Sequence, residues 1–67
     1  MGKDINRLKV VLAEQKRTSK WLAEQLGKSY NMINSYAQNR RQPSVEDLYK
    51  IAEILDVKVK ELLVERE

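Results

Sequence analysis

The sequence contains no cysteine and no histidine, and it has only one proline and two glycines. Without cysteine there is no disulfide, thiolate metal site or thiol nucleophile, and without histidine there is no imidazole general base. No apolar run approaches the roughly 20 residues that span a bilayer, and the N-terminus lacks the apolar core of a signal peptide. We therefore expect a non-enzymatic protein without cofactor or metal, which remains in the cytoplasm where it is made.

The chain is short, with 67 residues. This length allows one domain over residues 1–67, close to the lower size at which a chain folds without disulfides or metal. We find no internal repeat, linker or low-complexity segment in it. One compact unit is expected, with self-association as a possible aid to its stability.

The charges are distributed unevenly along the chain. Residues 1–43 carry nine Lys and Arg against three Asp and Glu, a net charge of +6, whereas residues 44–67 carry four against seven, a net charge of −3. A basic first part and an acidic second part favour a polyanionic partner on one side of the molecule. A solvated mixed surface without such a partner is the simpler alternative.

Hydrophobic spacing and helix-capping residues predict five short helices around one core, an all-α bundle. The first should cover residues 4–15. The second should be capped by Thr18 or Ser19 and end at Gly27, which can adopt the left-handed conformation. The third should follow a cap at Ser29, the fourth a cap at Ser44, and the fifth should cover residues 58–64. The apolar positions expected inside are Ile5, Leu8, Val11, Leu12, Leu22, Ala23, Leu26, Ile33, Tyr36, Leu48, Ile51, Ala52, Leu55, Val59, Leu62 and Leu63.

The second and third predicted helices are joined by a short turn through a glycine. Ala23 lies four residues before Gly27 and is small enough for the two helices to approach closely, and Ile33 can fill the space between them. The helix after the turn carries short polar groups on positions that a core does not need. This arrangement is typical of a helix-turn-helix.

The chain resembles the lambda-repressor-like helix-turn-helix family, the Cro/repressor or XRE type of bacterial and phage transcription regulators. The resemblance rests on SKWLAEQLGKS at residues 19–29, Ile33, the loop NRRQPS at residues 39–44, and LYKIAEILDV at residues 48–57. It covers roughly residues 5–64. It implies a compact five-helix DNA-binding domain that commonly works as a homodimer on palindromic operators.

The resemblance places the recognition helix at about residues 29–38 and implies that its outward residues read bases. These residues are Tyr30, Asn31, Asn34 and Ser35. An Asn amide can pair with adenine, a Ser hydroxyl can meet either kind of base edge, and a Tyr ring can touch a thymine methyl group. The alternative is that they are ordinary solvated residues, although Asn and Ser are poor helix formers.

A second set of residues is expected to contact the DNA backbone. Its members are Arg17, Ser19, Lys20, Lys28, Ser29, Asn39, Arg40 and Arg41. Such contacts fix the register of a protein on the duplex without reading its sequence. Each Lys or Arg could instead be a solvated charge, which is the interpretation we favour for Lys3, Lys9 and Lys16. Trp21 is expected to pack rather than to contact DNA.

The end of the chain is the expected dimer surface, with Val57, Val59, Leu63 and Val64 as its residues. The family often pairs there, and a two-fold dimer would place two recognition helices about 34 Å apart, one turn of the duplex. The alternative is that these residues only close the core of the monomer.

These patterns predict a sequence-specific transcription regulator of double-stranded DNA, either a phage-type repressor or the controller of a restriction-modification operon, with no small-molecule ligand. The alternative from another class is an antitoxin-like protein-interaction module whose acidic C-terminal half holds a partner protein.

Overall fold

The computed structural model describes residues 4–64 of the chain, and in this part four α-helices are followed by a short 3-10 helix. The elements are α1 (Leu8–Glu14), α2 (Ser19–Leu26), α3 (Tyr30–Ala37), α4 (Val45–Leu55) and η1 (Val59–Leu62). The all-α class is confirmed. The predicted count of five helices is corrected to four, because the fifth segment forms only a single 3-10 turn.

Helix α1 begins at Leu8, later than the predicted start at residue 4. The side chain of Asn6 sets this start, because its Oδ1 accepts a hydrogen bond from the backbone N–H of Leu8 at 3.0 Å. Ile5 therefore lies outside the helix and is 49% exposed, so its assignment to the inner face of the first helix was wrong. Its spacing fits the helical period, but the segment before Leu8 is not helical.

The C-terminal segment is also less helical than predicted. Beyond η1 the backbone becomes extended at Leu63 and forms an isolated antiparallel bridge with Asn6. Arg7 N–H donates to the Leu62 carbonyl at 2.7 Å, and Val64 N–H donates to the Ile5 carbonyl at 2.8 Å. This pairing satisfies backbone groups that a longer helix would otherwise use. Leu63 consequently is 37% exposed and does not join the core, contrary to prediction.

Three helix starts follow one local rule. Thr18, Ser29 and Ser44 each have an extended backbone and accept a hydrogen bond from the backbone N–H three residues later, at 3.0, 3.2 and 3.1 Å. Each bond satisfies one of the N–H groups that have no partner inside the helix. The two alternatives for the second helix are thereby resolved in favour of Thr18.

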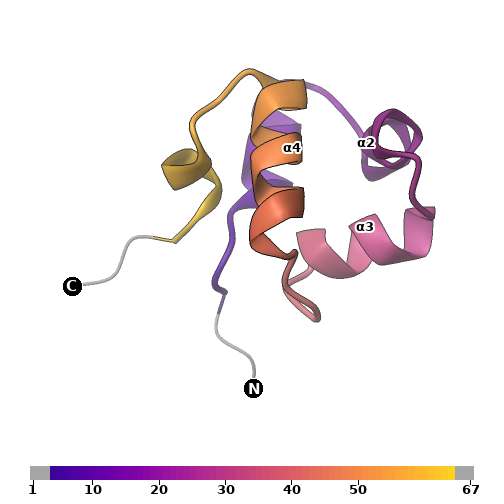
Figure 1. The fold of residues 1–67 in the computed structure, drawn as a ribbon, viewed down its shortest axis with the longest axis horizontal. Coiled ribbons are helices and arrows are strands. Elements are labelled where there is room, and N and C mark those ends of the chain that lie inside the picture. The colour runs from indigo at the N-terminus through magenta and orange to yellow at the C-terminus, as the bar shows by residue number, and fades with distance from the viewer. Residues whose placement is uncertain (1–3, 65–67) are drawn as a thin grey trace.

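The core joins all the helical elements. Its fully buried large side chains are Leu22 from α2, Ile33 from α3, Ile51 from α4 and Leu62 from η1. In Figure 1, α4 runs through the centre, α1 lies behind it, η1 lies on one side, and α2 and α3 lie on the other. Helix α3 is thus at the edge of the molecule, with one face packed and one face free. Among the described residues, no helix has the length and apolar character needed to cross a membrane.

Candidate nucleic-acid interface

The turn between α2 and α3 is built by Gly27, Lys28 and Ser29. Gly27 has φ of 69°, and its N–H donates to the Glu24 carbonyl at the end of α2. A Cβ added at this position would meet no atom within 4 Å, so glycine is favoured by the left-handed backbone and not by lack of space. Ser29 then caps α3. The predicted helix, three-residue turn and second helix are confirmed in their places.

Helix α3 has a buried and an outward face. Ile33, Tyr36 and Ala37 are buried, which confirms the assignment of Tyr36 to the core. On the other face Tyr30 is 50% exposed and Asn31 is exposed, while Asn34 and Ser35 are half-buried. All four predicted base-reading residues therefore lie on α3 with at least part of their side chains accessible.

Internal hydrogen bonds constrain part of this outward face. Ser35 Oγ donates to the Asn31 carbonyl at 2.9 Å, so its proton is used inside the helix and its oxygen remains as an acceptor. Gln38 Nε2 lies 3.5 Å from Asn34 Oδ1, and Arg40 Nη1 donates to Gln38 Oε1 at 2.6 Å. Gln38 was not predicted as a site residue. It connects the end of α3 to the loop that carries Arg40.

Two of the predicted backbone-contacting residues line one hollow of about 240 Å³ between α1, α2 and α3. Arg17 and Ser19 line it together with Asn34 of α3 and Gln38, the residue that follows α3. Lys9, which we interpreted as a solvated charge, lines the same hollow. The hollow therefore combines two cationic side chains with the first turn of α2, whose N–H groups favour an anion.

The predicted cations differ in how they are held. The Arg17 guanidinium lies 4.4 Å from the centre of the Trp21 ring, a cation–π contact, and Trp21 itself is half-buried against the core. Lys28 Nζ lies 3.8 Å from Asp47 Oδ2, which links the turn to α4. Lys20, Arg40 and Arg41 are exposed, as is Lys16, whereas Lys3 lies outside the described residues.

Asp47 stabilises the packed face of α3. It is buried, accepts a 3.3 Å hydrogen bond from the Tyr36 hydroxyl, and faces Lys28. Burial raises the pKa of the Tyr36 phenol, the negative charge of Asp47 and the hydrogen bond to it act in the same direction, and the positive charge of Arg41 lowers it. The phenol therefore stays protonated as a donor, and α3 is fixed to the start of α4.

Asn39 follows the C-cap of α3 with φ of 61°, the left-handed conformation, which Asn tolerates better than most non-glycine residues. Its side chain is turned into the protein and makes four hydrogen bonds there. Three of these involve Ile5 or Asn6, more than 30 residues earlier in the chain. Asn39, predicted as a contact to DNA backbone, thus has its side chain occupied within the fold.

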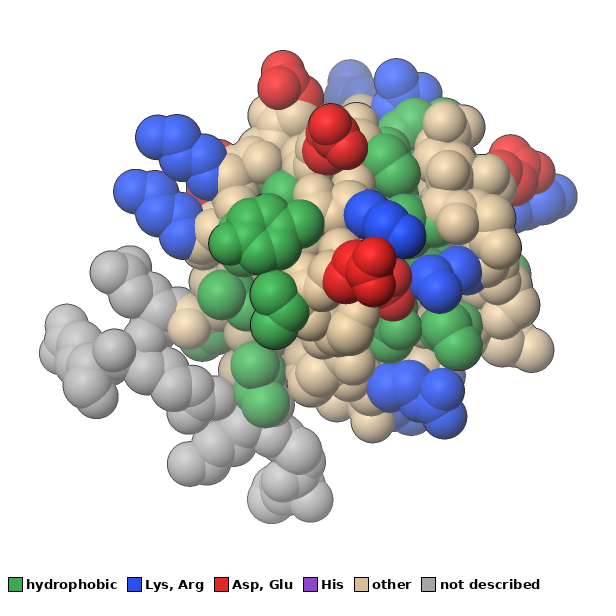
Figure 2. Space-filling model, in the orientation of Figure 1, with side chains coloured by type: hydrophobic (Ala, Val, Ile, Leu, Met, Phe, Trp, Pro, Cys, Tyr) green, Lys and Arg blue, Asp and Glu red, His purple; other side chains and the backbone are tan. Residues whose placement is uncertain are grey.

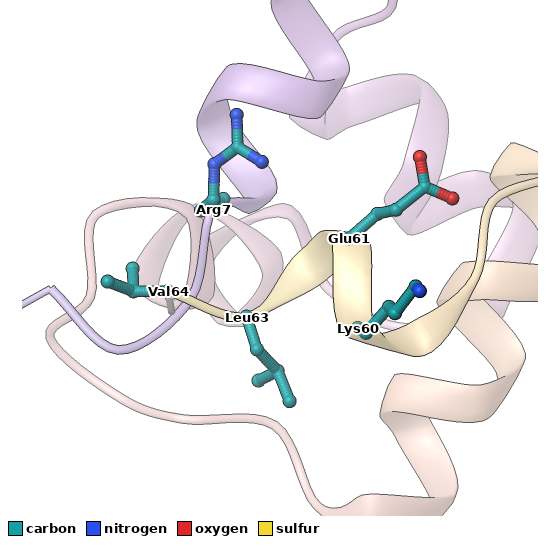
Figure 3. A pocket seen from close by; sticks show the side chains of 5 residues that line it. All are labelled: Arg7, Lys60, Glu61, Leu63 and Val64. Atoms are coloured by element: carbon teal, nitrogen blue, oxygen red, sulfur yellow. The ribbon is translucent and has the colours of Figure 1, made fainter. Parts of the chain in front are cut away.

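The predicted dimer residues lie on the side of the molecule opposite α3. Val57 and Val59 are partly buried against the core, Val64 is half-buried, and Leu63 is more exposed. Leu63 and Val64 line an open hollow with Arg7, Lys60 and Glu61, and Figure 3 shows the Arg7 side chain rising from the N-terminal segment in a different direction from Leu63 and Val64. Figure 2 shows hydrophobic side chains gathered between η1 and α4 on the visible face.

The comparisons with known proteins agree with this geometry. The helix-turn-helix family matches residues 8–62 of the chain. The crystal structure of a "putative DNA-binding protein" from Bacteroides fragilis is 52% identical, with a TM-score of 0.88, and the alignment covers 90% of this chain and 97% of that one. Among curated proteins no match is found.

Proposed function

Because the chain belongs to the lambda-repressor-like, XRE-type helix-turn-helix family, we propose that it is a non-enzymatic, sequence-specific regulator of transcription that binds double-stranded DNA. The observation that carries this proposal is the outward face of α3. Tyr30 and Asn31 project from its first turn, and among the described residues their side chains have no hydrogen-bond partner. The packed face behind them is fixed by Ile33 and Tyr36.

In the proposed complex, α3 enters the major groove, and Tyr30, Asn31, Asn34 and Ser35 meet base edges. Arg17, Ser19, Lys20, Arg40 and Arg41 bind phosphates on either side of it. We assign Lys28 and Asn39 a supporting part, since the first pairs with Asp47 and the second bonds inside the fold. Ser29 serves as the cap of α3, and its backbone stays available to a phosphate at the helix start.

We further propose that the protein acts as a homodimer on a palindromic operator, paired through Val57, Val59, Leu63 and Val64. One short helix reads only a few base pairs, and a dimer doubles the contacts. The exposed fraction of Leu63, at 37%, supports this assignment, because the neighbouring Leu62 already fills the core. A repressor of the phage type or a restriction-modification controller is the proposed biological setting.

Selection of bound sequences from a random duplex library tests the proposal directly. We expect a palindromic consensus with half-site centres about one helical turn apart. Affinity for it should fall steeply as salt rises, since counterions are released from the phosphates. Recovery of no preferred sequence, together with capture of a stable protein partner, would instead support an interaction module.

Replacing Arg41 with alanine is expected to weaken binding to all DNA sequences by about tenfold per bound protomer at 0.1 M salt, the counterion-release contribution of one phosphate contact. The slope of log affinity against log salt should become shallower by about 1 for each bound protomer. Fluorescence anisotropy on selected and random duplexes measures both quantities. Lys50→Ala removes an equal charge from an exposed position of α4 and should leave the slope unchanged.

Replacing Asn31 with alanine is expected to relax preference at one base position, with a loss of about 1–3 kcal/mol of discrimination there. Binding to random duplexes should be unaffected, and the helix should not weaken, because alanine is the best helix former. Gln25→Ala removes an exposed amide from α2 and serves as the control. If Asn31→Ala loses affinity equally on selected and random DNA, as Arg41→Ala is expected to do, the base-reading role of Asn31 is assigned wrongly.

A further inference from the structure

The loop after α3 is anchored at both of its ends to the segment that precedes α1. At the first end, Asn39 Oδ1 accepts from the backbone N–H groups of Ile5 and Asn6, both at 2.9 Å. Its Nδ2 donates to the Asn6 carbonyl at 3.0 Å. These bonds pair one side chain with two consecutive backbone units, as a neighbouring strand would.

At the second end, Gln42 closes the connection. Asn6 Nδ2 donates to Gln42 Oε1 at 2.8 Å, and Gln42 Nε2 donates to Asn39 Oδ1 at 3.1 Å. Asn6 is only 3% exposed, and its Nδ2 also donates to the Tyr36 carbonyl at the end of α3. Asn6, Asn39 and Gln42 therefore form a closed set of amides, which we call the amide cluster, around the base of the loop.

Arg40 and Arg41 are the two residues between the anchored ends. Their backbone N–H groups both donate to the Ser35 carbonyl, at 3.0 and 3.3 Å, so the loop turns back over the last turn of α3. Both side chains are exposed. The backbone of the loop is thus fixed by the amide cluster and by α3, while both guanidinium groups lie at the surface, that of Arg40 with Nη1 donating to Gln38 Oε1.

The segment that holds the amide cluster is itself held from the other side. Ile5 and Arg7 exchange backbone hydrogen bonds with Val64 and Leu62. The loop therefore depends on contacts that span almost the whole chain, and no residue of α3 alone could fix it. The Asn6 amide is buried, and the loss of its partners would leave polar groups unsatisfied, so Asn6 is expected to keep a single arrangement.

We propose that Asn6, Asn39 and Gln42 are positioning residues for DNA binding: the amide cluster sets the place of the loop so that Arg40 and Arg41 meet adjacent phosphates when α3 is in the groove. The proposal rests on the proposed function. It gives these amides a role in affinity through the two arginines and no direct contact with bases.

Asn39→Gly is the variant that separates the positioning role of the Asn39 side chain from the backbone conformation of this residue. Glycine keeps the left-handed conformation at φ of 61° but removes all four side-chain hydrogen bonds. We expect about a tenfold loss of affinity per bound protomer at 0.1 M salt and a salt slope shallower by about 1 for each bound protomer, with the selected base preference retained. Ile51→Val, a buried change in α4, is the control for lowered stability, and binding is measured well below both melting temperatures.

The decisive measurement is a double-mutant cycle with Arg40→Ala/Arg41→Ala. If the amide cluster acts through these arginines, Asn39→Gly should have no further effect on affinity once both are removed. An equal loss in the two backgrounds, or a wild-type salt slope in Asn39→Gly, would overturn the proposal. Failure of the proposed function is distinct, because the unaltered protein would then show no salt-dependent binding to duplex DNA.

Discussion

Replacing Ile33 with alanine is expected to leave the protein largely unfolded at 37 °C. Ile33 has no exposed surface and lies on the face of α3 that packs against the core. Buried Ile→Ala changes remove about 2–5 kcal/mol, through lost burial and the cavity that remains. A core in a chain of this size rarely supplies more than about 3–5 kcal/mol in total. One side chain thus accounts for most of the available stability.

Thermal and urea unfolding followed by circular dichroism measure this loss. Val45→Ala is the matched control, because Val45 is also β-branched but is 68% exposed at the start of α4. Its free energy of unfolding should change by no more than about 0.5 kcal/mol. If Ile33→Ala unfolds at the same temperature as Val45→Ala, then Ile33 does not hold α3 against the rest of the molecule.

The turn and the two helices around it could be predicted because their signals are local. Gly27 ends one helix, and Ser29 caps the next helix two residues later. The spacing of Ile33 and Tyr36 fixes the inner face of that helix. Each of these features acts over four residues or fewer. The outward face of α3 follows from the same period, so the sequence also predicts that Tyr30, Asn31, Asn34 and Ser35 lie on the face that the packing leaves accessible.

The ends of the chain could not be predicted in the same way. Ile5 and Leu63 both match a helical spacing, yet both lie in extended segments that pair with one another. The Ile5 carbonyl accepts a hydrogen bond from Val64, and Leu63 forms a bridge with Asn6. Asn6 carried the one available signal, since a short polar residue before an apolar helix marks a helix start. Its remaining hydrogen bonds reach residues 36, 39 and 42, and sequence spacing does not encode such distant partners.

The same limit applies to the charged and amide side chains of the candidate interface. Lys28 and Asn39 were selected for their residue types and positions, but Asp47 and Asn6 decide where they point. Lys9 was set aside although folding brings it beside Arg17 and Ser19. Composition therefore identifies a basic surface, whereas only the packing of α1 against α3 shows which cations share it.

Replacing Leu63 with aspartate is expected to prevent the proposed dimer without unfolding the monomer. Leu63 is 37% exposed and extended, and Leu62 fills the adjoining core position. A charge placed between two copies would be buried without a partner, which strongly disfavours association. A linked second half-site contributes about 10²- to 10⁴-fold to affinity, so binding to the palindromic duplex should fall by that factor.

A duplex that contains a single half-site provides the internal control. Leu63→Asp should bind it as the unaltered protein does, because one recognition helix is enough there and the new charge lies on the side away from α3. Sedimentation of each protein with the palindromic duplex gives the number of bound copies, with two expected before the change and one after it. An unchanged affinity for the palindrome, with two copies still bound, would show that the dimer does not use the C-terminal surface. Equal losses on both duplexes would mean that the aspartate disturbs either the fold or the approach to DNA. The melting temperatures of the two proteins distinguish these cases, and we expect them to be similar.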